Sequence, residues 1–194
     1  GDPIVLVTGS SENRRYGLAD QAGNILLEPR YPFIGNFSEG LAAYTADPLE
    51  KYGEKNPHAR IGYLDTQGKT VITPQFAQAA RFSAGVAWVK QPDSGDWLLI
   101  DRTGKTLLRA PYTYQILGNF DKNGLAKIRK NNFYGLINQR GESVLAAEYD
   151  FLNWDNVGQF YLLEKNGKYG AADAQGKVVI SPDFDALTLS LIHI

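Results

Sequence analysis

Residues 61–76 read Ile-Gly-Tyr-Leu-Asp-Thr-Gln-Gly-Lys-Thr-Val-Ile-Thr-Pro-Gln-Phe, and a closely similar pattern occurs five times along the chain. It consists of an aromatic-glycine pair, an Asp or Asn, a glycine three positions later, an apolar run, and an aromatic eight positions after that glycine. The turn pairs are Asp20 and Gly23, Asp65 and Gly68, Asp101 and Gly104, Asn138 and Gly141, and Asp173 and Gly176. Such fixed offsets, at a period of about 36 residues, indicate a repeat architecture.

A second shared phrase, Phe-Ser-x-Gly-x-Ala, lies between the copies. It begins at Phe37 and Phe82, and weaker versions follow at residues 120–126 and 158–162. Each unit is therefore predicted to contain three strands: one at this phrase, a second with the aromatic-glycine pair, and a third apolar strand. Turn residues separate the three strands in every copy.

Together, these phrases resemble the bacterial WG (KWG) repeat family over nearly the whole chain. The chain departs from the family pattern at Ile61, where the family has an aromatic, at Leu98, where it has glycine, and at Ala147, where it has proline. The resemblance implies a β-rich repeat scaffold in bacterial, often exported, proteins. It also implies that there are no shared catalytic residues.

The repeats predict an all-β fold of tandem β-hairpins or meanders. Each unit is too small to bury its own apolar face, so we expect a single domain over residues 1–194. The expected units are about 4–40, 41–85, 86–124, 125–158 and 159–194. Five units of this length are compatible with short propeller blades.

The two ends of the chain favour closure of the repeats into a ring. Residues 4–7 resemble the strand of the second phrase, and Leu187, Leu189 and Leu191 alternate with polar residues as in a half-buried strand that needs a partner. We therefore expect a propeller-like ring of five units. The alternative is an open β-solenoid, which would show the same period.

Composition excludes several classes of function. The chain has 20 basic and 21 acidic side chains, so no field of one sign attracts nucleic acid or anionic lipid. It has no cysteine and no apolar run long enough to span a bilayer. It begins with Gly and lacks methionine, so we expect a processed or trimmed product without its leader. The resemblance favours a periplasmic or extracellular bacterial protein.

The Asp or Asn of each copy is expected to shape a turn. Its side chain can accept hydrogen bonds from the backbone two residues on, and the following glycine supplies a positive φ. One carboxylate per turn lacks the several oxygens that calcium requires, so we predict no metal site and no cofactor. Glycines 17, 62, 135 and 170 are expected where a neighbouring backbone or ring comes close.

The clearest departure from the repeat is an insertion, residues 45–60, about ten residues longer than its counterparts. It is polar, contains two prolines, and carries Tyr52 and His58 as candidate ligand-binding residues. Long loops serve as binding elements or are tolerated insertions, and both interpretations remain open here.

A second set of candidates is aromatic. Tyr112, Tyr114 and Trp154, with Asn153 and Asp155 beside them, place flat rings next to amide and carboxylate groups. This combination suits sugar or peptide surfaces, whereas core packing explains the same residues more simply.

Catalytic motifs are missing: there is no Gly-x-Ser-x-Gly elbow, no phosphate loop and no His-x-x-x-His pair. We therefore expect a monomeric, non-enzymatic module that binds a protein or a cell-envelope component. The alternatives are a lectin-like glycan binder and a glycan hydrolase in which Asp150 or Asp155 is an acid.

Overall fold

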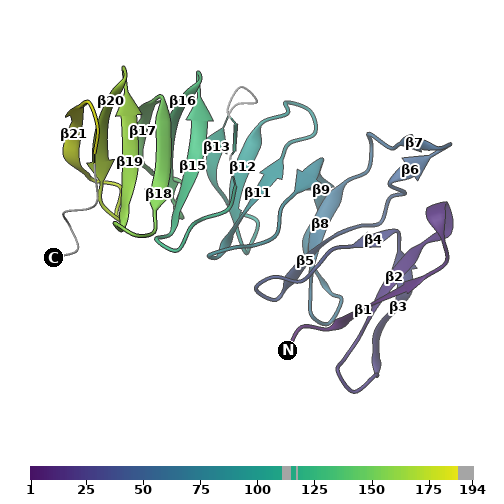
Figure 1. The fold of residues 1–194 in the computed structure, drawn as a ribbon. Helices are drawn as coiled ribbons and strands as arrows, with labels where there is room; N and C mark the ends of the chain where they lie inside the picture. Colours follow the sequence, from purple (N-terminus) through teal and green to yellow (C-terminus); the bar gives the residue numbers. More distant parts are fainter. Residues whose placement is uncertain (111–114, 117, 188–194) are drawn as a thin grey trace. The chain divides into compact units, whose positions relative to one another are not determined.

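The computed structural model describes residues 1–110, 115–116 and 118–187, and these residues form the predicted all-β fold. The strands make five antiparallel meander sheets in chain order (Figure 1). By compactness the chain divides into two units, Gly1–Pro111 and Tyr112–Ile194.

The first unit contains three of the sheets and an additional hairpin. Its first sheet comprises β1 (Ile4–Thr8), β2 (Arg15–Ala19) and β3 (Ile25–Tyr31), with the 3-10 turn η1 (Ser11–Asn13) between β1 and β2. The second comprises β4 (Phe33–Ile34), β5 (Leu41–Thr45), β8 (Ile61–Asp65) and β9 (Thr70–Phe76). The third comprises β10 (Gln78–Ala79), β11 (Val86–Lys90), β12 (Trp97–Asp101) and β13 (Thr106–Ala110). The hairpin is β6 (Glu50–Lys51) with β7 (Glu54–Lys55).

The second unit contains two sheets of the same design. The fourth sheet comprises β14 (Gln115–Ile116), β15 (Leu125–Lys130), β16 (Phe133–Asn138) and β17 (Ser143–Tyr149). The fifth comprises β18 (Phe151–Asp155), β19 (Phe160–Lys165), β20 (Lys168–Ala172) and β21 (Val178–Phe184).

Four sheets have four strands, one more than the three predicted for each unit. The additional strand comes first, and it is only two residues long in β4, β10 and β14. In the second, third and fifth sheets it follows almost directly after the aromatic that ends the preceding sheet, as Phe33 follows Tyr31. Each sequence repeat therefore supplies the last two strands of one sheet and the first two of the next. Consequently, the units expected from residues 41, 86 and 125 begin at the second strand of a sheet.

The core of the first unit lies between neighbouring sheets. In β5 and β8, Leu41 and Tyr63 pack against the third sheet, while Ala42 and Leu64 pack in the cluster shared with the first sheet. Successive side chains of a strand point to opposite faces, so the second sheet buries both of its faces. This explains why successive residues of its strands are apolar instead of alternating with polar ones.

The second unit has a corresponding core between the fourth and fifth sheets. In the first unit the large side chain at this contact is Tyr63 and the small one opposite is Ala87. In the second unit the corresponding residues are Leu136 and Tyr161, so the tyrosine comes from the following sheet.

The Asp and Asn turns have the predicted geometry in all five copies. In the second sheet, Asp65 Oδ1 accepts hydrogen bonds from the backbone N–H groups of Gln67 at 2.9 Å and Lys69 at 3.0 Å. Gly68 lies at φ +79° and its N–H donates to the Asp65 carbonyl. These Asp and Asn side chains therefore stabilise the hairpins.

Glycine in the third strand of a four-stranded sheet permits a close approach of backbone. Gly62 lies opposite a bulge, because Ile61 pairs with Phe76 and Tyr63 pairs with Ile72. A Cβ atom on Gly62 would lie 2.4 Å from the carbonyl oxygen of Ile72, a contact too short for real atoms. Of the two predicted partners, the neighbouring backbone is thus the one observed.

The third sheet shows what happens when this glycine is replaced. Leu98 pairs directly with Arg109, and the register from Trp97 to Leu99 runs without a bulge. Loss of the bulge makes room for the leucine side chain, which is buried in the core.

Closure into a ring and the single domain stay predictions. Most of the C-terminal segment expected to close the ring, including Leu189 and Leu191, lies outside the described residues.

Replacement of Gly62 by alanine is expected to lower the free energy of unfolding by about 2 kcal/mol or more, because the new methyl group overlaps backbone that cannot move aside cheaply. Urea denaturation measures the loss. Gly35→Ala is the matched control, since its Cβ would meet its nearest atoms at an ordinary 3.5 Å. Equal stability of the two variants would refute this account of the bulge.

Candidate functional site

The connections between the strand of the second repeat phrase and the strand of the aromatic-glycine pair differ between the two units. In the second unit they are the two-residue turns Asn131–Asn132 and Asn166–Gly167, all with positive φ. In the first unit, residues 9–14, 46–60 and 91–96 make the corresponding connections. The longer connections of the first unit line two hollows beside the insertion.

The insertion is held by hydrogen bonds at its base. The Asp47 carboxylate accepts the backbone N–H of Arg60 at 3.0 Å, and Thr45 Oγ1 accepts the N–H of Asp47 at 3.1 Å. Asn56 Nδ2 donates to the carbonyl of Pro48 at 2.7 Å, and the Asn56 N–H donates to the carbonyl of Leu49 at 2.8 Å. The two ends of the insertion are therefore joined, which reduces the entropy lost when a ligand binds.

The hairpin β6–β7 forms the middle of the insertion (Figure 1). Glu50 lies opposite Lys55 and Lys51 lies opposite Glu54, so opposite charges face one another across it. Tyr52 is at the tip with a positive φ, and 90% of its surface is exposed. The hairpin thus presents an exposed ring between balanced charges.

The larger hollow lies between the insertion and the third sheet, with a volume of about 1030 Å³. Its aliphatic and proline lining consists of Leu49, Pro57, Ala59, Ile61, Ala77 and Pro92. Its charged lining consists of Glu50, Lys55, Lys90 and Asp93. Among the described residues that line it, none is aromatic. A volume of this size is typical of a ligand site.

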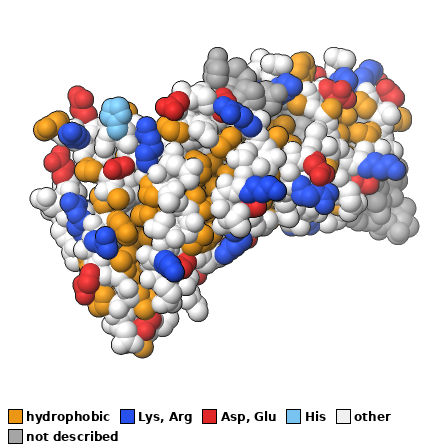
Figure 2. Space-filling model, turned by 180° about the vertical axis from the view of Figure 1, so that it is seen from behind, with side chains coloured by type: hydrophobic (Ala, Val, Ile, Leu, Met, Phe, Trp, Pro, Cys, Tyr) orange, Lys and Arg blue, Asp and Glu red, His pale blue; other side chains and the backbone are white. Residues whose placement is uncertain are grey.

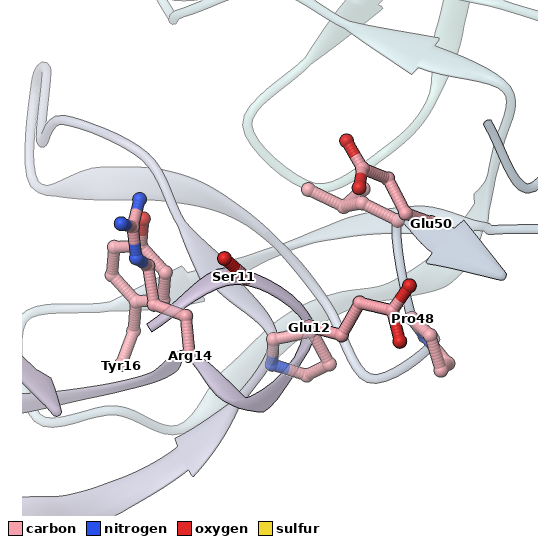
Figure 3. Close-up of a pocket in the computed structure, with 8 residues that line it drawn as sticks. Ser11, Glu12, Arg14, Tyr16, Pro48 and Glu50 are labelled. Carbon is pink, nitrogen blue, oxygen red and sulfur yellow. The ribbon is translucent and has the colours of Figure 1, made fainter. Parts of the chain in front are cut away.

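The smaller hollow lies on the other side of the insertion and has a volume of about 220 Å³. Figure 3 shows Ser11, Glu12 and Arg14 of the first sheet's connection on one side, and Pro48 and Glu50 of the insertion on the other. Leu49 and Glu50 line both hollows. The start of the hairpin is therefore the wall that the two hollows share.

Two predicted ligand residues, Tyr52 and His58, lie in the insertion. Neither lines the larger hollow: Tyr52 is at the tip, and His58 is exposed with its N–H donating to Asn56 Oδ1 at 3.0 Å. Residues 90–95, which do line it, were missed. Comparison of connection lengths between repeats would have found them, because residues 91–96 replace a two-residue turn.

The other predicted residues lie in the second unit, and Tyr112 and Tyr114 are outside the described residues. Trp154 is half-buried, packs edge-on against Tyr161 with 4.7 Å between ring centroids, and donates from Nε1 to Asn156. Asp155 Oδ1 accepts the N–H groups of Val157 and Gly158. Trp154 thus contributes to the core, and Asp155 forms a turn.

Asn153 belongs to a small polar cluster between the fourth and fifth sheets. Lys127 Nζ donates to Asn153 Oδ1 and to the carbonyl of Leu152, both at 2.9 Å, and burial lowers the pKa of Lys127. Tyr161 Oη donates to the Asp121 carboxylate. The cavity beside these groups has a volume of about 140 Å³, too small for a drug-sized ligand.

The carboxylates considered for hydrolysis are engaged in backbone contacts. Asp150 Oδ2 accepts the N–H of Asn166 at 2.9 Å, as Asp155 accepts those of its own turn. Within the described ranges, no three His, Asp or Glu side chains gather closely enough to hold a metal ion. The described part of the chain also contains no helix long and apolar enough to cross a membrane.

The repeat recognised in the sequence matches a known family model, described as WG containing repeat. The chain belongs to this family. Five segments match, residues 16–47, 61–92, 99–132, 134–169 and 169–188. They begin at or near the strand with the aromatic-glycine pair, which is the third strand of most sheets. Comparison with curated proteins found no match.

Three solved structures are similar to this WG repeat chain at low identity. BamB from Moraxella catarrhalis is 16% identical with a TM-score of 0.39, over 92% of this chain and 60% of BamB. A protein of unknown function from Bacteroides caccae is 14% identical with a TM-score of 0.32, over 91% and 76% of the two chains. Apo AztD from Citrobacter koseri is 14% identical with a TM-score of 0.30, over 97% of this chain and 60% of AztD. The chain therefore spans less than two thirds of BamB and of AztD.

Alkaline pH is expected to destabilise the second unit through Tyr161. Burial, followed by the Asp121 carboxylate, raises the pKa of Tyr161, so the folded phenol keeps its proton at pH values where the unfolded one ionises. Its contribution to stability is therefore complete below about pH 10 and is lost above it, by up to about 1.4 kcal/mol per pH unit.

Urea denaturation from about pH 9 to 11.5 tests this, with Tyr161→Phe as the comparison. The variant should lose stability less steeply than the wild type over this range. Parallel curves would contradict the assignment.

Proposed function

We propose that this chain is a non-enzymatic binding module and that its ligand is a protein, held at the hairpin β6–β7 and the larger hollow beside it. The observation that supports this most strongly is the 1030 Å³ hollow between the insertion and the third sheet. An insertion without a function would not require hydrogen bonds that join its two ends, or a hollow along its side. We therefore favour the binding interpretation of residues 45–60.

A protein ligand is favoured over a glycan by the side chains in the hollow. Sugar rings stack on aromatic faces, and the described lining of this hollow is aliphatic, proline-rich and polar instead. Tyr52 at the hairpin tip suits a protein partner, because exposed tyrosines are frequent among the residues that dominate protein interfaces. Of the aromatic set suggested for glycans, Trp154 is half-buried against the core of the second unit.

Balanced charge supports the same ligand class. Figure 2 shows basic and acidic side chains interspersed over the visible face. Interfaces between proteins tolerate such a mixed rim, whereas nucleic acids need a basic surface. We further propose a periplasmic or extracellular location in a bacterium, on the strength of the family resemblance, and a monomeric state.

The test is to incubate the purified chain with an array of folded bacterial envelope proteins and, in parallel, with a glycan array that includes peptidoglycan fragments. We expect signals on the protein array that weaken at least about tenfold with Leu49→Arg, since the substitution places a charge in the hollow. Val71→Arg is the matched control: Val71 is 45% exposed, close to the 40% of Leu49, and lies outside the hollow.

Signals confined to glycans would overturn the choice of ligand. Protein signals equally sensitive to both substitutions would overturn the location of the site.

A further inference from the structure

We propose that the larger hollow binds its protein ligand through one extended, uncharged segment, which adds as a strand alongside the edges of β7 and β10. This rests on the proposed function and specifies the form of the ligand. One hollow combines two strands with unpaired edges, an aliphatic lining and balanced charge.

Two strands that line the hollow each lack a partner on one side. Among the described strands, β7 pairs with β6 alone and β10 pairs with β11 alone. Lys55 of β7 and Gln78 of β10 both line the hollow. An unpaired edge offers backbone N–H and C=O groups to an added chain, and proteins use this mode to bind extended peptides.

The short edges cannot hold a long strand by hydrogen bonds alone, because β7 and β10 have two residues each. Side-chain burial must supply the rest. Leu49, Ala59 and Ile61 provide an aliphatic wall. Alternate side chains of an extended peptide point to opposite sides, so one row would face this wall and the other would face solvent. The ligand is therefore a segment in which apolar and polar residues alternate.

The charges of the hollow determine the charge of this segment. Glu50 and Lys55 are direct cross-strand partners on the hairpin, and Lys90 and Asp93 lie on the opposite wall. Each wall thus has one charge of each sign and no net charge. A segment without net charge fits best. Its affinity should depend little on salt concentration, because neither the hollow nor the segment carries a net charge for salt to screen.

The experiment starts from a displayed library of random peptides of about eight residues, a usual strand length. The library is selected on the immobilised wild-type chain after depletion on the Leu49→Arg chain. The most enriched peptide is synthesised in three forms: unmodified, N-methylated at the odd-numbered residues, and N-methylated at the even-numbered residues. N-methylation keeps the side chains and removes the N–H groups that a strand edge would pair with.

We expect enriched peptides with alternating apolar and polar residues. In fluorescence anisotropy titrations, N-methylation in at least one of the two alternating patterns should weaken binding at least about tenfold, as expected when several backbone hydrogen bonds are lost together. Val71→Arg should leave the affinity within about twofold of the wild type, because it lies outside the hollow.

Three results would overturn the inference: no peptide enriched by wild type over Leu49→Arg, equal affinity of both N-methylated forms and the parent peptide, or a strongly charged consensus. Each of them leaves the proposed function standing if the protein array gives signals sensitive to Leu49→Arg. A protein array without signals sensitive to Leu49→Arg would contradict the proposed function itself. The two failures are therefore distinguishable.

Discussion

Burial of both faces of a sheet is the constraint on which the rest of the first unit depends. The second sheet places Tyr63 in one core cluster and Leu64, its neighbour along the strand, in the other. A one-residue change of register would exchange these faces, so pairing along the strands is tightly specified. The connections between strands carry no such requirement, and the chain can lengthen them without disturbing either core. The insertion occurs at one of these connections.

This constraint explains which parts of the fold the sequence predicts. Repeated spacing identified the turns and the strands, because Asp65 and Gly68 recur wherever the hairpin recurs. The short first strands were missed, since two residues such as Gln78 and Ala79 carry no periodic signal. The response of the fold to Leu98 could not be predicted either. Leu98 removes the bulge by changing how β12 pairs with β13, and the spacing pattern of the repeat does not report that pairing.

The candidate site was predicted in part, for a similar physical reason. A long polar insertion is visible in the sequence, and Tyr52 at its tip was named from it. The hollow, however, requires residues 90–95 of the neighbouring sheet, and only packing brings them to the insertion. Within the described residues, Trp154 packs against the core of the second unit, because an aromatic side chain in a strand is as useful to a core as to a ligand. Pattern alone does not separate these two uses.

Binding of a ligand in the hollow beside the hairpin is tested most directly by an NMR titration of the isotope-labelled chain with a capped Val-Thr-Val peptide, in which apolar and polar residues alternate. The account predicts concentration-dependent shifts at the amides of Ala59, Ile61 and Gln78, which line the hollow, while the indole N–H of Trp154 in the second unit stays unchanged. Shifts confined to Trp154 and its neighbours, with the hollow silent, would contradict it.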